Sequence, residues 1–340
     1  MLFGLSAVVL AVLILPFCVK KIEHNVEVFL FAMGIVSCFI SSQWSVDLVK
    51  EGLREPILIS LAVFAFGMLF KKLRRTLDKA IQQALKILPL PIFVFLLIIL
   101  LGLASSIITA IVAALVLVEV VALLPLDKKF ETKIVIIACF AIGLGAALTP
   151  VGEPLATIAI AKLKSWPHVD FWFLFHLIGW EVTAAIVALA LFSFFLHGRK
   201  SGKSLKAEHR EESVAEISWR AGKVYLFVMA LIFLGQGFKP MIDQIVTPLS
   251  GEILYWINTI SAILDNATLT AAEISTAMNP VQIKKLLMGL LIAGGMLIPG
   301  NIPNIIAASK LKISSKEWAR LGLPLGFILM LIFFFILESE

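Results

Sequence analysis

The stretch Ser261-Ala262-Ile263-Leu264-Asp265-Asn266-Ala267-Thr268 places an acid and an amide between two apolar arms, at roughly 250–260 and 267–278. The surrounding chain is strongly hydrophobic. A carboxylate at membrane depth costs about 2.5–3.5 kcal/mol on insertion scales, so such a residue usually faces a water-filled site. We therefore expect this stretch to carry function and the rest of the chain to hold it near the middle of a bilayer.

The composition predicts an all-α polytopic membrane protein. Of 340 residues, 60% are hydrophobic and 15% are charged, whereas soluble domains contain about 25% charged residues. Several apolar runs approach or exceed the ~17–25 residues that a membrane-spanning helix needs; they include 2–17, 56–70, 88–103, 171–196 and 322–337. The three cysteines lie in apolar runs without metal-ligand spacing, so we expect packed thiols.

Paired prolines break two of the apolar segments. Pro150 and Pro154 interrupt one, and Pro299 and Pro303 interrupt another; because proline removes a helical hydrogen bond, neither segment can be one continuous helix. These breaks and the polar loops divide the chain into four parts. We expect two transmembrane helices in 1–55 and a cytoplasmic linker at 197–222. The part 56–196 is expected to contain a hairpin at 88–126 and a broken helix at 132–163, and the part 223–340 a hairpin at 241–279 and a broken helix at 282–311.

The second and fourth parts follow the same order of features. Ser105 to Thr109 aligns with Ser261 to Asp265, and each double-proline break is followed by Lys-Leu-Lys (162–164 and 310–312) and then by a tryptophan, Trp166 or Trp318. Such internal symmetry is typical of transporters. The sequence therefore predicts two repeats, each with a re-entrant helical hairpin and a discontinuous transmembrane helix.

Basic residues predict the orientation. If both hairpins are re-entrant, eight full spans place all but seven of the 29 Lys and Arg residues on one side. The positive-inside rule then puts both termini outside and inverts the repeats. The same distribution accounts for the net charge of +6 without a nucleic-acid partner. The basic, amphipathic stretch 71–87 is typical of a helix lying in the interface, although it could also extend the preceding helix.

Oxygen-bearing side chains gather at the hairpin tips and the helix breaks. The tips carry Ser105, Ser106, Thr109, Ser261, Asp265, Asn266 and Thr268, and the breaks carry Thr149, Glu153, Thr157, Asn301 and Asn304. This set includes two acids and no Lys or Arg, and it matches the carboxylate, hydroxyl and amide oxygens that hard cations prefer. Asp265 and Glu153 are thus the candidate Na⁺ ligands. Two carboxylates that face each other can also exchange a proton for the cation.

Simpler roles remain open for these acids. Asp265 could cap the second hairpin arm, and Glu153, directly before Pro154, could serve only the helix dipole. Four more residues are candidates for a proton relay, or for packing and interfacial positions: Glu119, Glu273, Glu181 and His176.

The motifs SAILDNATLT, IPGNIPN and KLKISSKEWARLGLPLG resemble the ion transporter superfamily, and within it the NhaD-type sodium/proton antiporters, whose second-half tip also reads Ser-Ala-x-x-Asp-Asn. The resemblance implies inverted repeats with re-entrant hairpins, commonly in a homodimer. By match, Ser261, Asp265 and Asn266 form the second-half site, with Asn301 and Asn304 beside it. The first half departs from the pattern, because its tip reads Thr109-Ala110 and its acid is Glu153 in the break.

We expect a secondary-active cation transporter of a prokaryotic cytoplasmic membrane that exchanges Na⁺ for H⁺ by an elevator-like or rocking motion. Its partners are the inorganic cation, the proton, the lipid bilayer and a second copy of the chain, and no cofactor is expected. The alternative is a sodium-coupled carrier of a small organic anion of the citrate or dicarboxylate type, with Asp265 binding only the coupling ion. An intramembrane enzyme would need a nucleophile–base pair or metal ligands, and neither pattern appears.

Overall fold

The computed structural model describes residues 1–23, 25–196, 213–245, 251–264, 266–274 and 276–338. These residues form helices and no β-strand. The helices are α1 (Leu2–Cys18), α2 (Lys20–Glu23), α3 (Val26–Ile40), α4 (Val46–Ile87), α5 (Leu90–Ile108), α6 (Ala110–Leu123), α7 (Lys128–Ala146), α8 (Pro154–Lys162), α9 (Phe173–Phe195), α10 (Val214–Ile245), α11 (Gly251–Ile257), η1 (Asn258–Ala262), α12 (Asn266–Glu273), α13 (Pro280–Gly294), η2 (Ile298–Gly300), α14 (Ile302–Leu311) and α15 (Ser315–Glu338).

Several of these helices are long and apolar enough to cross a bilayer. Within the described residues they are α4, α5, α9, α10 and α15, while α1, α3 and α6 are apolar but shorter. Leu and Phe side chains face outward from them, for example on α15, where Phe327, Ile328 and Phe335 are exposed. The prediction of a helical, multi-pass membrane protein is confirmed.

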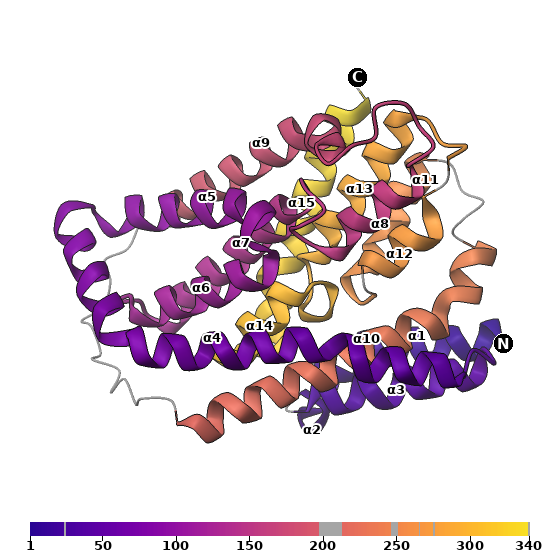
Figure 1. The fold of residues 1–340 in the computed structure, drawn as a ribbon, viewed down its shortest axis with the longest axis horizontal. Coiled ribbons are helices and arrows are strands. Elements are labelled where there is room, and N and C mark those ends of the chain that lie inside the picture. Colours follow the sequence, from indigo (N-terminus) through magenta and orange to yellow (C-terminus); the bar gives the residue numbers. More distant parts are fainter. Residues whose placement is uncertain (24, 197–212, 246–250, 265, 275, 339–340) are drawn as a thin grey trace.

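The helices α3, α4 and α10 form one side of the molecule (Figure 1), where α10 packs along both α3 and α4. Glycines allow α3 and α10 to approach closely. A Cβ atom added at Gly34 of α3 would lie 2.8 Å from Cβ of Phe233, and one added at Gly237 of α10 would lie 2.1 Å from Oγ of Ser37. The backbones at this crossing are therefore too close for larger side chains.

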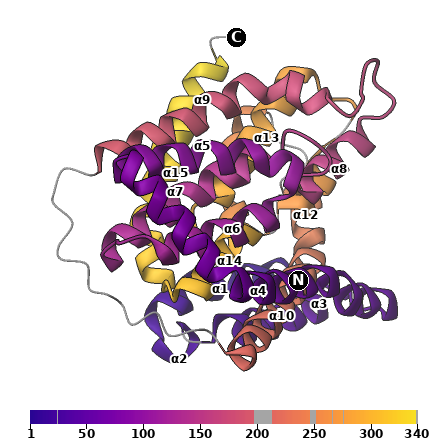
Figure 2. The same cartoon turned by 60° about the vertical axis from the view of Figure 1, so that its left-hand side comes forward.

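The remaining helices form a body with two corresponding sets of contacts. In the first set α5 and α9 pack on α7, and in the second α11, η1 and α15 pack on α13. The sets also interlock, because α6 packs on α14 and α12 packs on α8; Figure 2 shows both pairs side by side. The helices α7 and α13 are buried along most of their length, so they form the centre of the body.

Both helix breaks lie where the prolines predict them. The helix α7 ends at Ala146 and α8 begins at Pro154, while α13 ends at Gly294 and α14 begins at Ile302, after the short helix η2. Proline occupies one of the first two positions of both α8 and α14, where its missing N–H costs no helical hydrogen bond. The prolines thus end one helix and start the next.

Two expectations outside the body need correction. Residues 71–87 do not form a separate interfacial helix, because they continue α4, a single helix of 42 residues that starts at Val46. The apolar stripe at three- and four-residue steps fits either arrangement, so periodicity alone could not separate them. The helix α10 begins at Val214, inside the segment expected as a linker, and the rest of that linker, 197–212, lies outside the described residues.

We predict that Gly237→Ala lowers the unfolding temperature, since the new methyl group must displace Ser37 and the backbone of Cys38. Overpacking of this kind costs about 1–3 kcal/mol. The control is Gly222→Ala in the same helix, where a Cβ meets nothing within 4 Å; there alanine should stabilise the helix by about 0.5–1 kcal/mol. Thermal unfolding of both variants in detergent measures the difference. Equal melting temperatures would contradict this packing of α3 on α10.

Candidate functional site

The first hairpin tip is attached to its own break through the backbone. The turn between α5 and α6 lies at Thr109, whose φ is 73°, a region that β-branched residues rarely adopt. The N–H of Ala110 donates to the carbonyl of Gly152 at 2.9 Å, and the hydroxyl of Thr149 donates to the carbonyl of Ser106. These bonds hold tip and break together, so the Thr149 hydroxyl has a structural role.

The predicted serines fasten each hairpin to the centre of the body. Oγ of Ser105 donates to the carbonyls of Gly102 at 2.6 Å and Ile142 at 2.9 Å, and Oγ of Ser261 donates to the carbonyl of Leu290 at 3.0 Å. Ile142 lies on α7 and Leu290 on α13. The two serines thus make corresponding contacts in the two halves, and their oxygens keep lone pairs for a ligand.

Side chains take up the carbonyl groups that the second break leaves without helical partners. Nδ2 of Asn304 donates to the carbonyls of Gly294 and Leu297, at 2.8 Å each, and Nε1 of Trp318 donates to the carbonyl of Gly295 at 3.1 Å. These carbonyls are therefore hydrogen-bonded within the protein. The Trp318 contact leaves no signal in the sequence beyond the recurrence of a tryptophan after each break.

Asn266 and Asn304 converge on Gly294. A Cβ atom added at Gly294 would lie 2.6 Å from Nδ2 of Asn266, so this side chain lies directly against the end of α13. Both residues are buried. Nδ2 and Oδ1 of Asn266 and Oδ1 of Asn304 have no hydrogen-bond partner among the described residues. The second tip and the second break thus meet at a buried spot with free hydrogen-bonding capacity, unlike most protein interiors.

Glycine keeps this spot narrow. A Cβ added at Gly300 in the break would lie 2.5 Å from the carbonyl oxygen of Gly294 and 2.9 Å from that of Ser261. Asn301, at the start of α14, reaches the other half of the body, because its Nδ2 would lie 2.6 Å from a Cβ at Gly143 of α7. The second break therefore touches the second tip on one side and α7 on the other.

Of the two predicted carboxylates, the structure describes only Glu153. Asp265 and the side chain of Thr268 lie outside the described residues. Glu153 is buried at the N-cap position of α8 and makes no side-chain capping bond; this position is next to the positive end of the helix dipole. Thr157, one turn further, donates to the carbonyl of Pro150 at 2.8 Å. Ser106 donates to the carbonyl of Leu103 at 2.7 Å within α5.

Two of the four candidate relay residues form ion pairs between the halves. Glu119 of α6 pairs with Lys310 of α14 at 3.0 Å, and Glu181 of α9 pairs with Lys284 of α13 at 2.7 Å. Glu273 is buried, whereas His176 is exposed in the first turn of α9. The lysine partners were missed because each pair joins residues more than 100 positions apart.

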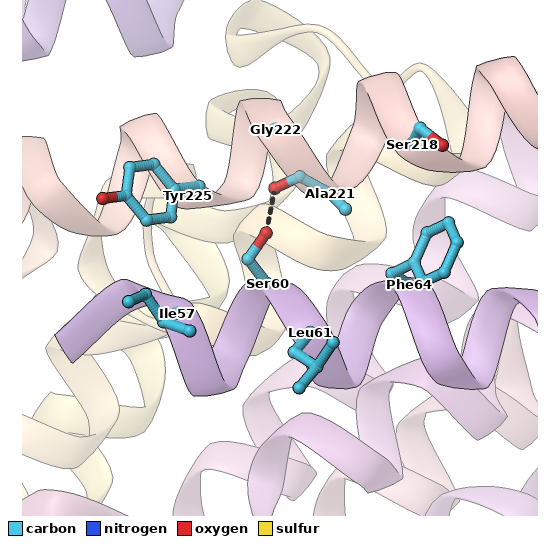
Figure 3. Close-up of a pocket in the computed structure, with 8 residues that line it drawn as sticks. All are labelled: Ile57, Ser60, Leu61, Phe64, Ser218, Ala221, Gly222 and Tyr225. Carbon is cyan, nitrogen blue, oxygen red and sulfur yellow. Dashed lines mark hydrogen bonds between the residues drawn. The ribbon is translucent and has the colours of Figure 1, made fainter. Parts of the chain in front are cut away.

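A pocket between α4 and α10 has no charged side chain in its lining that could bind an ion. Figure 3 shows its lining, where Oγ of Ser60 donates to the carbonyl of Ala221 at 2.7 Å. The other lining residues are Ile57, Leu61, Phe64, Ser218, Gly222 and Tyr225, and they include no acid or base. In the described part of the chain, no three His, Cys, Asp or Glu side chains come together as metal ligands. The tip–break region of the second half is therefore the candidate site.

The chain belongs to the family described as "Protein of unknown function (DUF1646)", whose family model matches residues 2–339. No curated protein matches the chain. The match spans both broken helices and both hairpins of the chain.

We predict that Asn304→Ala lowers the unfolding temperature strongly, because two buried carbonyls lose their donor. Each such loss costs about 1–3 kcal/mol. Asn304→Asp, which keeps the shape but removes the N–H groups, should destabilise similarly. The control is Asn301→Ala, since Asn301 makes no side-chain capping bond at the start of α14. If the Asn304 and Asn301 variants unfold at the same temperature in detergent, the carbonyl-capping role is wrong.

Proposed function

We propose that this member of the DUF1646 family is a secondary-active cation transporter that exchanges Na⁺ for H⁺. The observation that carries the proposal is the meeting of Asn266 and Asn304 at Gly294, where buried amide oxygens have no partner among the described residues. Burying a polar group without a hydrogen-bond partner costs free energy. A site that keeps such groups is therefore suited to reversible binding of a ligand.

The chemistry of the surrounding side chains favours a cation. The residues at the second tip and break are a serine and several asparagines, and Asp265 is next to Asn266 in sequence. No Lys or Arg lies among them, which disfavours an anion. Na⁺ is a hard cation, and carboxylate, amide and hydroxyl oxygens are suitable ligands for it. In the proposed mechanism Asp265 and Glu153 supply the negative charge and take up cation or proton in turn.

The corresponding contacts of the two halves support alternating access. In the proposal the halves are inverted repeats, and each hairpin is re-entrant. The exchanged packing, α6 on α14 and α12 on α8, means that each hairpin arm lies on the broken helix of the other half. A movement of one half therefore changes the surroundings of both tips, which is what alternating access needs. We further propose a homodimer in a prokaryotic cytoplasmic membrane, with both termini outside.

The test is proton flux in proteoliposomes with an internal pH-sensitive dye. NaCl, LiCl, KCl, MgCl₂ and citrate are added in turn to the wild type, Asp265→Asn and Glu153→Gln. The wild type should respond to Na⁺ or Li⁺, and each neutralised carboxyl should abolish the response because cation and proton lose their shared ligand. Asp47→Asn is the control, since Asp47 is an exposed acid in the first turn of α4.

Two outcomes would contradict the proposal. If only citrate together with Na⁺ moves the dye, the protein is a sodium-coupled carrier of an organic anion. If Asp265→Asn and Glu153→Gln both exchange at the wild-type rate, the site lies elsewhere.

A further inference from the structure

Polar groups follow the buried face of α12 along its whole length. Asn266, Thr270 and Glu273 are spaced by four and three residues, so they lie on one face of this helix. Thr270 is 0% and Glu273 1% exposed. In the described part of the chain, Oγ1 of Thr270 and both carboxyl oxygens of Glu273 have no hydrogen-bond partner, like the amide of Asn266. Such a row of unpaired groups needs an explanation.

The corresponding face in the first half is apolar. When Ser105 to Thr109 is aligned with Ser261 to Asp265, the positions that match Asn266, Thr270 and Glu273 are Ala110, Ala114 and Leu117, all buried. Because α6 packs on α14 as α12 packs on α8, the fold does not require polar side chains at these positions. The polar row is a property of the second half alone.

Glu273 is the titratable group of this row. The side-chain amide of Asn258, on η1, is its polar neighbour. A buried carboxylate without an ion-pair partner is strongly disfavoured, and such a group is accommodated by taking up a proton. The surroundings of Glu273 in this conformation therefore suit the neutral acid.

A lysine is placed to receive the carboxylate when the proton leaves. Nζ of Lys162, at the end of α8, donates to the carbonyl of Ile274 at 3.3 Å, the residue directly after Glu273. The corresponding lysine of the second half, Lys310 of α14, already pairs with Glu119 of α6 at 3.0 Å. The pairing of a hairpin acid with a broken-helix lysine of the other half is thus closed between α6 and α14 and open between α12 and α8. Lys162 is exposed, whereas Glu273 and Ile274 are buried.

Other charged groups on the helices around α12 are committed or differently placed. Helix α12 packs against α8, α10 and α13. On α13, Lys284 pairs with Glu181, and Lys285 pairs with Glu252 and Glu338. The remaining charged residue of α8 is Glu153, at the opposite end of that helix. On α10, Lys223 pairs with Glu27, Lys239 is exposed, and the side chain of Asp243 lies outside the described part. The other charged residues of α10 are Glu216 and Arg220. Lys162 is therefore the cation best placed for Glu273.

We propose that Glu273 relays the exchanged proton between the carboxylates of the proposed site and water, and that Lys162 is its counter-charge after release. The inference rests on the proposed cation/proton exchange. In the step, the O–H bond of Glu273 breaks, the proton passes to water beside the exposed Lys162, and the carboxylate pairs with the Lys162 ammonium group. Thr270 lies between Asn266 and Glu273 along this face of α12, and its hydroxyl can both donate and accept a hydrogen bond.

Infrared difference spectroscopy of the purified protein across a pH series tests the proton site without transport. The wild type should show the C=O band of a protonated carboxyl that disappears as the pH rises, and Glu273→Gln should lack it. Lys162→Met should retain the band to higher pH, because the carboxylate loses its counter-charge. Two control variants should leave the band unchanged. Glu131→Gln removes a carboxylate that is paired with Lys128. Lys128→Met removes a lysine that donates to the carbonyl of Leu311 at the end of α14.

Proton flux in proteoliposomes completes the test. Glu273→Gln should lower cation-driven proton flux about a hundredfold, as expected when a positioned proton-transfer group is removed, and Glu273→Asp should restore part of it. A wild-type flux and pH profile in Glu273→Gln would overturn the inference while leaving the exchange function intact, and so would persistence of the band in this variant. Loss of the band in Glu273→Gln, with no cation-driven flux in the wild type, would support the proton site and refute the exchange function.

Discussion

Backbone groups that lose their helical partners inside a membrane must find others within the protein, because lipid offers none. The architecture of the body follows from this constraint. At the first break, the tip residues Ala110 and Ser106 bond to Gly152 and Thr149. At the second, Asn304 and Trp318 bond to the carbonyls of Gly294, Leu297 and Gly295. Each break is thus stable only together with the elements packed around it.

The two halves satisfy the constraint differently, and the difference locates the chemistry. Around the first tip the described polar groups are paired with backbone. Around the second tip, Asn266, Thr270 and Glu273 carry unpaired atoms on one buried face, whereas the matching residues of α6 are Ala110, Ala114 and Leu117. The polar face of α12 therefore holds groups that can exchange partners with an ion or a proton, in addition to Asp265 and Glu153 of the proposed site.

Much of this fold could be predicted from composition and proline positions. Pro150, Pro154, Pro299 and Pro303 mark both breaks, because proline has a strong and local effect on a helix. The course of α4 through residues 71–87 could not be predicted, since an interfacial helix and a helical extension share one periodicity. Contacts that join distant positions, such as Lys310 with Glu119 and Lys284 with Glu181, leave no local signal. Of the polar row on α12, the sequence indicated Asn266 and Glu273 as candidates but not Thr270, and the meaning of the row depends on burial.

Equilibrium binding of radioactive sodium to the purified protein at several pH values tests the central claim most directly. The account predicts saturable Na⁺ binding whose affinity falls as the pH falls, because proton and cation compete for the same carboxylates, Asp265 and Glu153. Absence of Na⁺ binding at every pH, or an affinity that does not change with pH, would contradict it.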